Sequence, residues 1–412
     1  MQDMSNNQWP INRFKKFIGS VLLLPAAMAA SKTSWAGDSM VESYYPETYE
    51  ESRLAFVSNC AIIDQAVCHK YAIESKTDPG KLWIDTAFIP GQGYKLLVVE
   101  SGIHGPESNA AAGAQLLLMD RHLSGLHKAG FDILLIHGVN PWGWKHGRIG
   151  DEDNVNLTRN FYVGKSIYSK INSDYELNLF QFEPQGKVSE ISFDSFRLYI
   201  ALIATVLGQF SDYATINSGF DQGQYAHPRG VNFGGYKHVQ QTLILQDILT
   251  PVLQNDYDEI LFVDFRTGWG AKNVLSVISG IEPPKDKFYQ LKNKLAGING
   301  IEFHTPNPTD PKHIHYDGDV IDYVPKLTPH EKSKFLAVTM DYGTIGNDTV
   351  AQLQKVSRII LENQAYWFGC ENKEVCAKVR QDFLDIFNPA DQNWRAAVLQ
   401  QADEVFTAFE KN

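Results

Sequence analysis

The chain has 412 residues, of which 43% are hydrophobic and 12% aromatic, and its formal net charge is -11. A chain of this size and composition can bury a large core in one or two domains. The acidic balance argues against a nucleic acid or an anionic membrane as partner, because both favour basic surfaces.

The first part of the chain has the pattern of a targeting segment. A basic stretch ending at Lys16 precedes the apolar stretch 17–30, which is too short to span a bilayer comfortably. Small residues at 27–29 or at 34–36 offer Ala-x-Ala-like cleavage sites. We therefore expect residues 1–36 to be a signal peptide, with an uncleaved N-terminal anchor as the alternative. No later stretch is long and apolar enough to span a membrane, so the protein is expected to be exported, either periplasmic or secreted.

The four cysteines form two local pairs, Cys60 with Cys68 and Cys370 with Cys376. In an oxidising compartment this spacing predicts two small disulfide loops, although three pairings are possible. A zinc knuckle is the alternative. It is disfavoured because neither pair has the short Cys-x-x-Cys spacing of such sites.

Residues 37–90 are predicted to be a lead-in, and residues 91–412 a domain that includes the C-terminal helices. Apolar runs of strand length alternate with stretches of helical periodicity, which predicts an α/β fold. Its central sheet is expected to be mostly parallel or mixed, with helices on both faces. The predicted strands are 94–101, 131–137, 259–265 and 334–341, and the predicted helices are 107–129, 193–207, 239–253 and 350–367, with one or two more in 377–409.

Two stretches, 162–190 and 280–330, are rich in Gly, Asn, Pro and Asp and have weak periodicity. They are predicted to be long loops, which in such a fold usually shape the ligand crevice.

His104 and Glu107 lie three residues apart on the turn between the strand 94–101 and the helix that follows it. This is the carboxyl end of a strand, where open α/β sheets place their ligands. An imidazole and a carboxylate this close could hold a divalent metal such as zinc. Taken alone, the pair is more typical of a helix cap.

Polar motifs also follow the other predicted strands. The strand 131–137 is followed by Asn-Pro-Trp-Gly at 140–143, then by Arg148 and the block Asn-Val-Asn-Leu-Thr-Arg-Asn-Phe at 154–161. The strand 259–265 leads into Asp-Phe-Arg-Thr-Gly at 264–268, and the last one ends in Asp-Tyr-Gly-Thr at 341–344.

In this order the motifs resemble the zinc carboxypeptidase superfamily, and more closely its bacterial branch, domain-of-unknown-function family 2817. The resemblance covers residues 90–370. It implies a zinc-carboxypeptidase-like fold and a metallopeptidase-like site that uses zinc to activate water while a carboxylate accepts its proton.

By position in these motifs, His104 and Glu107 match the first two zinc ligands, and Arg148 matches the arginine that stabilises the oxyanion. Arg159 matches the arginine that grips a substrate carboxylate, a natural bidentate pair. The residues flanking Arg159, namely Thr158 and Asn160, are expected to bind substrate with it.

Four positions depart from the family pattern. The third zinc histidine is replaced by Arg266, and the general-base glutamate by the shorter Asp341. Thr158 replaces an asparagine, and Asn156 replaces an aspartate. Arg266 matters most, because a guanidinium is permanently charged and cannot ligate zinc. Zinc held by two protein ligands would be weakened or lost.

Two outcomes are open for this position. Either another histidine completes the site, or Arg266 occupies the metal's place and pairs with Glu107 and Asp264. In the second case Arg148, Arg159 and Arg266 would make an anion-attracting pocket. The histidines available for the first case are His137, His146, His304, His313, His315 and His330.

The sequence therefore favours an exported pseudoenzyme that binds a carboxylate-bearing peptide or cell-wall-like ligand. The alternative is an active metallohydrolase, of metallocarboxypeptidase or amidase type, with a non-standard third metal ligand. A third possibility is acid/base catalysis without metal by Asp341 and His104, which nothing in the sequence favours specifically.

Overall fold

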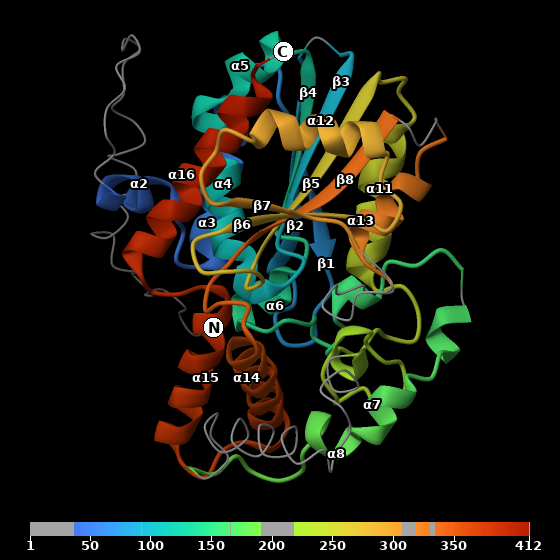
Figure 1. Ribbon diagram of the computed structural model, residues 1–412, viewed down its shortest axis with the longest axis vertical. Coiled ribbons are helices and arrows are strands. Elements are labelled where there is room, and N and C mark those ends of the chain that lie inside the picture. The colour runs from blue at the N-terminus through green and yellow to red at the C-terminus, as the bar shows by residue number, and fades with distance from the viewer. Residues whose placement is uncertain are drawn as a thin grey trace, which may run out of the picture.

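The computed structural model describes residues 37–91, 93–164, 166–190, 218–306, 318–329 and 334–411. In this part of the chain a mixed sheet of eight strands forms the centre of the fold (Figure 1), which confirms the predicted α/β class. The strands β4, β3, β5 and β8 run parallel. On one side β2 pairs antiparallel with β4 and β1 with β2; on the other, β6 pairs antiparallel with β8 and β7 pairs parallel with β6. The order across the sheet is β1 (Val67–Ile73), β2 (Leu82–Ile89), β4 (Phe131–His137), β3 (Lys95–Ser101), β5 (Glu259–Thr267), β8 (Phe335–Tyr342), β6 (Leu275–Ser279) and β7 (Ile301–His304).

The central strands are buried on both faces, which explains why their sequences read as continuous apolar runs. Successive side chains of a strand point to opposite faces. In β3, Leu97 and Val99 accordingly join one hydrophobic cluster, while Leu96 and Val98 join another. The two clusters are the cores above and below the sheet.

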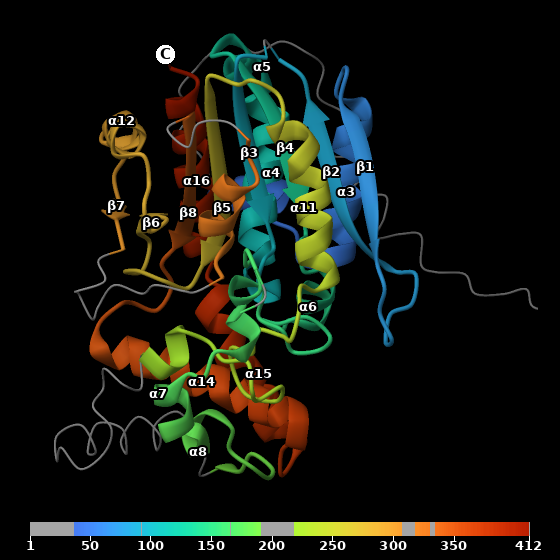
Figure 2. The same cartoon turned by 90° about the vertical axis from the view of Figure 1, so that its right-hand side faces the viewer.

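Helices cover both faces, and a further group lies beyond the carboxyl ends of the parallel strands (Figures 1 and 2). The first core is covered by α2 (Gly37–Tyr44), α3 (Tyr49–Ile62), α4 (Ser108–Arg121), α5 (Leu123–Lys128), α12 (Lys285–Leu295) and α16 (Gln392–Phe409). The second core is covered by α11 (Gln240–Leu253), α13 (Val320–Tyr323) and η5 (Val324–Lys326). The helices beyond the strand ends are α6 (Pro141–His146), α7 (Ser173–Leu177), α8 (Leu179–Phe182), α14 (Thr349–Phe368) and α15 (Lys373–Phe387).

The structure differs from the sequence prediction in several connecting regions. The segment 37–90, expected as a lead-in, supplies β1 and β2 to the same sheet. The stretch 280–330, predicted to be a loop, contains α12, β7 and α13, and 162–190 contains α7 and α8. The predicted helix 193–207 and the proposed leader 1–36 lie outside the described residues.

Both predicted disulfides are present, Cys60 with Cys68 and Cys370 with Cys376. The first joins the end of α3 to β1, and the second closes the turn between α14 and α15. Among the described residues no helix has the length and apolar character needed to cross a membrane.

The contact between α16 and the sheet gives a test of this packing. Phe406 is fully buried and lies edge-on to Phe265 of β5, with ring centroids 6.0 Å apart. We expect Phe406→Ala to lower the free energy of unfolding by about 3–5 kcal/mol in urea denaturation, because it leaves a cavity in the core. Phe180→Ala is the matched control, since Phe180 is 66% exposed and should change stability by less than about 0.5 kcal/mol. Equal losses in the two variants would contradict the placement of α16.

Candidate functional site

His104 and Glu107 lie at the turn that follows β3, as the sequence predicted. The residues Gly105–Glu107 form the short helix η1, which packs backbone to backbone on α6. A Cβ atom at Gly105 would lie 2.0 Å from the carbonyl carbon of Gly143, so only glycine fits there. Asn140 starts α6 by accepting a hydrogen bond from the Gly143 N–H, which fixes the position of this contact.

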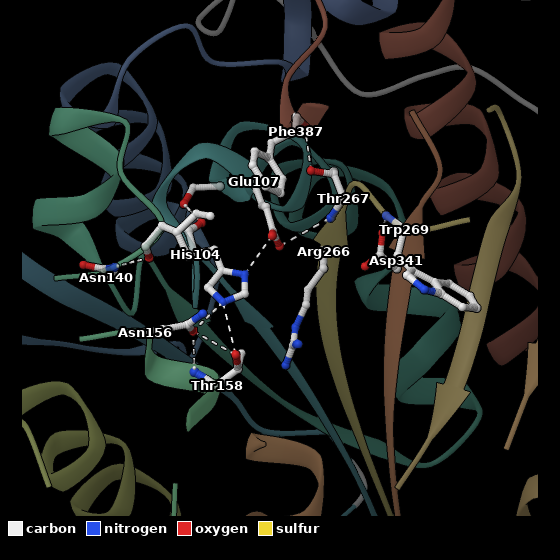
Figure 3. Close-up of polar contacts among 12 residues, drawn as sticks. His104, Glu107, Asn140, Asn156, Thr158, Arg266, Thr267, Trp269, Asp341 and Phe387 are labelled. Atoms are coloured by element: carbon white, nitrogen blue, oxygen red, sulfur yellow. Dashed lines mark hydrogen bonds and ion pairs between the residues drawn. The ribbon is translucent and has the colours of Figure 1, made fainter. Parts of the chain in front are cut away.

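Both ring nitrogens of His104 have partners in the chain (Figure 3). Nδ1 lies 2.7 Å from Oε1 of Glu107, and Nε2 lies 2.9 Å from Oδ1 of Asn156 and 3.3 Å from Oγ1 of Thr158. The second carboxylate oxygen of Glu107 faces the N–H of Thr267 at 3.4 Å. The turn 104–107, the block 154–161 and the motif 264–268, which the sequence singled out, therefore meet at one place.

The residues present do not fit a zinc ion. Two ligands of a tetrahedral zinc, each at about 2.0–2.1 Å from the metal, stand about 3.3 Å apart, whereas Nδ1 of His104 and Oε1 of Glu107 are at hydrogen-bond distance, 2.7 Å. The next position around the site belongs to Arg266. Within the residues that the structure describes, no group of three or more His, Cys, Asp or Glu side chains is placed to hold a metal ion.

Arg266 lies near the end of β5 and is held by two aspartates. Its Nε donates to Asp264 at 2.5 Å, and its two terminal nitrogens donate to the two oxygens of Asp319 at 2.8 and 3.2 Å. Asp319 is the N-cap of α13, which explains its fixed position. Burial raises the pKa of Asp319, but the charge of Arg266 outweighs burial and holds that pKa below its ordinary value. The expected ion pair between Arg266 and Asp264 is confirmed. The second ion-pair partner of Arg266 is Asp319, where the sequence predicted Glu107.

A second carboxyl group, Glu100, stands opposite Asp264 on the neighbouring strand. Glu100 is fully buried, and neither of its oxygens has a hydrogen-bond partner among the described residues when it is ionised. When it is protonated, it can donate a hydrogen bond to Asp264. Burial first, and then the charge of Asp264, raises the pKa of Glu100 well above its ordinary value. Glu100 therefore favours its neutral, protonated form beside Asp264.

Arg148 is enclosed by α14. Its Nη2 donates to Asn154 at 2.7 Å and to Asn363 at 3.0 Å, and its guanidinium carbon lies 3.7 Å from the ring centroid of Tyr366. Its Nη1 makes no hydrogen bond, but stands 3.5 Å from Oε1 of Glu362. Burial raises the pKa of Glu362, and Arg148 acts against that rise.

A small hollow of about 20 Å³, partly open to solvent, lies beside this arginine. Most of its polar wall is made of amide side chains from the 154–156 block and from α14. Its polar lining comprises Arg148, Asn154, Asn156, Asn232, Glu362 and Asn363.

Arg159 and its neighbours are buried beneath the crevice. Arg159 donates to the backbone oxygen of Thr158 at 3.3 Å and to the hydroxyl of the same residue. Its charge also acts on Asp319 and on Asp221; burial raises the pKa of Asp221 to about 7 despite this opposing charge. Asn160 uses its amide fully inside the chain: it donates to the backbone oxygens of 234 and 237 and accepts from the N–H of 239 and the hydroxyl of 242. It thus ties two loops together and has no hydrogen-bonding group left over.

Asp341, at the end of β8, accepts a hydrogen bond from the N–H of Trp269 at 2.8 Å. It stands opposite Arg266 in the pairing of β5 with β8. Burial first, and then the nearby charge of Glu107, raises the pKa of Asp341 well above its ordinary value. A carboxyl group in this state is more readily a proton donor than the base expected from the resemblance.

The described histidines outside the turn do not reach the site. His137 is buried between Ser52 and Gln115, His146 contacts Asp78, and His304 packs against Trp269 at the β7 edge. His313, His315 and His330 lie outside the described residues.

Several residues of the site were missed by sequence reasoning. Asp319 precedes a four-residue helix inside a stretch that was predicted to be a loop, and no motif links it to Arg266. Lys355, Glu362 and Asn363 fall within the predicted helix 350–367. Their spacing of seven and eight residues places them on one helix face. That spacing was the available signal, but it does not say which face is buried.

A family model described as "Protein of unknown function (DUF2817)" matches residues 45–401. No curated protein sequence matches.

Three solved structures illustrate the structural similarity. A candidate metallopeptidase from Shewanella amazonensis is 12% identical over 77% of this chain and 92% of its own, with a TM-score of 0.39. Thrombin activatable fibrinolysis inhibitor is 10% identical over 84% and 75%, with a TM-score of 0.45. A metallo-carboxypeptidase from Pseudomonas aeruginosa, solved with (2-guanidinoethylmercapto)succinic acid, is 12% identical over 87% and 70%, with a TM-score of 0.40.

The buried carboxyl pair predicts a pH-dependent stability. The pKa of Glu100 is raised on folding, so the folded state holds a proton that the unfolded state releases. The contribution of Glu100 to the stability of the fold is therefore present at low pH and is lost as pH rises. Glu100→Gln removes this loss. We expect the free energy of unfolding of the variant, relative to the native chain, to rise by up to about 1.4 kcal/mol per pH unit above pH 5.

Urea denaturation at pH 5, 6, 7 and 8 measures this difference. Glu51→Gln is the control, because Glu51 is exposed on α3 and its removal should give no such trend. A constant difference for Glu100→Gln across this range would show that Glu100 is ionised in the folded protein.

Proposed function

The chain belongs to the DUF2817 family of proteins of unknown function, and we propose that it is an exported, zinc-carboxypeptidase-like binding protein without zinc-dependent hydrolysis. Its proposed ligand is a carboxylate-bearing peptide or a cell-wall-like fragment. The observation that carries the proposal is the position of Arg266. This cation is locked between Asp264 and Asp319 where the resemblance places a metal-ligating histidine.

The charge balance around Arg266 supports the absence of a metal from this site. A zinc ion beside a buried guanidinium would place two positive charges in a region of low dielectric constant, at a high electrostatic cost. His104 and Glu107 also satisfy each other by a hydrogen bond, so neither depends on a metal for a partner. Such a site is stable as a hydrogen-bonded cluster of the chain alone.

The pocket beside Arg148 supports the binding role. It combines a guanidinium with several amide groups, and these bind carboxylates and peptide groups by hydrogen bonds rather than by covalent chemistry. In this proposal Arg148, Arg159 and Thr158 contribute to ligand binding. Asp341 and His104 shape the crevice floor.

The two disulfides support export, because such bonds persist mainly in oxidising compartments. In this proposal residues 1–36 are the signal that directs the chain there.

Zinc content distinguishes this proposal from the alternative of an active metallohydrolase. We expect the mature chain, purified without chelator and dialysed against trace zinc, to contain no stoichiometric zinc and to keep its melting temperature in EDTA. About one zinc per chain by elemental analysis would overturn the proposal and support a third ligand.

A gain of zinc binding in a variant is the complementary test. Arg266→His combined with Asp319→Asn restores an imidazole without leaving Asp319 as an unpaired buried charge, and asparagine can still cap α13. We expect this double variant to bind zinc more tightly than the native chain, measured by titration calorimetry. Asp319→Asn alone is the control, and equal zinc affinity in the two variants would count against the assignment of position 266.

Ligand binding is tested with a minimal carboxylate probe. We expect N-acetyl-L-alanine to bind the native chain about tenfold or more tightly than its neutral N-methylamide, because a charged hydrogen bond contributes about 1.5–3 kcal/mol. Titration calorimetry at pH 7 measures both. Equal affinities, or no binding of either probe, would contradict carboxylate recognition.

A further inference from the structure

The arginines around the crevice already have carboxylate partners within the chain. Arg266 pairs with Asp264 and Asp319, and Arg148 stands 3.5 Å from Glu362. The charge of Arg159 acts on Asp319 and Asp221. A ligand carboxylate that bound to any of these arginines would have to compete with an internal carboxylate at close range. The anion-attracting pocket expected from three arginines is therefore largely neutralised from within.

Lys355 differs from these arginines. It lies on α14, is only 7% exposed, and its Nζ makes no hydrogen bond to any described residue. Its position one turn before Ile359, and two turns before Glu362 and Asn363, puts it on the helix face that walls the pocket beside Arg148.

The surroundings of Lys355 are those of an incomplete ion site. The carboxylates whose charges act on it are Asp341 at the end of β8 and Asp348, the N-cap of α14. Neither carboxylate forms an ion pair with Nζ of Lys355. Both accept hydrogen bonds from the backbone instead: Asp341 from the N–H of Trp269, and Asp348 from the N–H of Ala351. A buried ammonium group normally has a paired anion. Here the space between Nζ and the Asp341 carboxyl is wider than an ion pair.

We propose that Lys355 is the residue that receives the anionic oxygen of the ligand, with the ligand group inserted between its amine and the carboxyl group of Asp341. The proposal rests on the carboxylate-binding function proposed above and names the cation that performs it. The ligand class is a small carboxylate presented at the end of a peptide-like group. The amide part of the ligand would then lie against Asn363 and Glu362 along the same helix face.

This arrangement makes binding sensitive to pH in a defined direction. Burial lowers the pKa of Lys355 to about 8, while Asp341 and Asp348 act against that decrease. A bound carboxylate stabilises the protonated amine, so binding raises its pKa and takes up a proton near pH 8. Affinity for a carboxylate should therefore be constant below pH 7 and fall above pH 8, approaching tenfold per pH unit.

The experiment uses N-acetyl-L-alanine as probe and titration calorimetry at pH 7, 8, 9 and 9.5. We expect Lys355→Met to bind it at least tenfold more weakly than the native chain at pH 7 and to lose the fall in affinity above pH 8. Lys355→Arg, whose charge does not titrate in this range, should retain binding with a flat pH profile. Lys272→Met removes the same charge from an ion pair with Asp391 at the surface and should leave both affinity and pH profile unchanged.

The outcomes separate the two proposals. Equal binding by the native chain and by Lys355→Met would overturn the assignment of Lys355 while leaving carboxylate recognition intact. No binding to the native chain would overturn both. The same question can be answered without a variant. Reductive methylation of the native chain, followed by mass spectrometry, should modify Lys355 more slowly when N-acetyl-L-alanine is present, and Lys272 at the same rate. Unchanged methylation of Lys355 would contradict the proposal.

Discussion

The ion-pair cluster of Arg266 with Asp264 and Asp319 is the interaction on which the arrangement of the site depends. A guanidinium has five donors in a fixed plane, and here three of its nitrogens are used by two carboxylates. Asp264 belongs to the same strand, whereas Asp319 caps a helix more than fifty residues later in the chain. The pair with Asp319 therefore fixes the loop before β8 against the end of β5. Buried charges of this kind persist only when each is matched, so the cluster would lose much of its stability if one member were removed.

The cluster also determines the state of the groups around it. Burial and then the charge of Asp264 raise the pKa of Glu100, which stands opposite Asp264 on β3, so Glu100 favours its protonated form. Asp341 faces Arg266 in the strand register, but burial and Glu107 keep its pKa high. His104 and Glu107 are left to bond to each other. A chain of neighbouring residues thus reaches electrostatic balance without any group from outside.

The sequence was sufficient for the parts of the fold that depend on local pattern. The runs 94–101 and 131–137 predict β3 and β4 to within one residue, because buried central strands have nearly uninterrupted apolar sequences. The strands β1, β2, β6 and β7 were missed. β1 is largely exposed, β2 lies in the segment expected as a lead-in, and β6 and β7 have only five and four residues. The turn at His104 could be predicted because its motif is local. The partner Asp319 and the buried Lys355 could not, because their positions depend on how α13 and α14 pack against the end of the sheet.

The position of α14 has a consequence for the expected roles of the arginines. In a hydrolase, the arginine that stabilises an oxyanion must present free donors to a charge that appears only in the transition state. Arg148 instead gives one nitrogen to Asn154 and Asn363, and Tyr366 covers the face of its guanidinium. The contacts of Asn363 and Tyr366 come from the same helix that carries Lys355. Glu362 of this helix forms an ion pair with Arg148 at 3.5 Å, whereas Lys355 on the same helix has no ion pair or hydrogen bond to a described residue. Lys355, which no sequence motif names, is therefore more available to an anionic ligand than the arginines of the motifs.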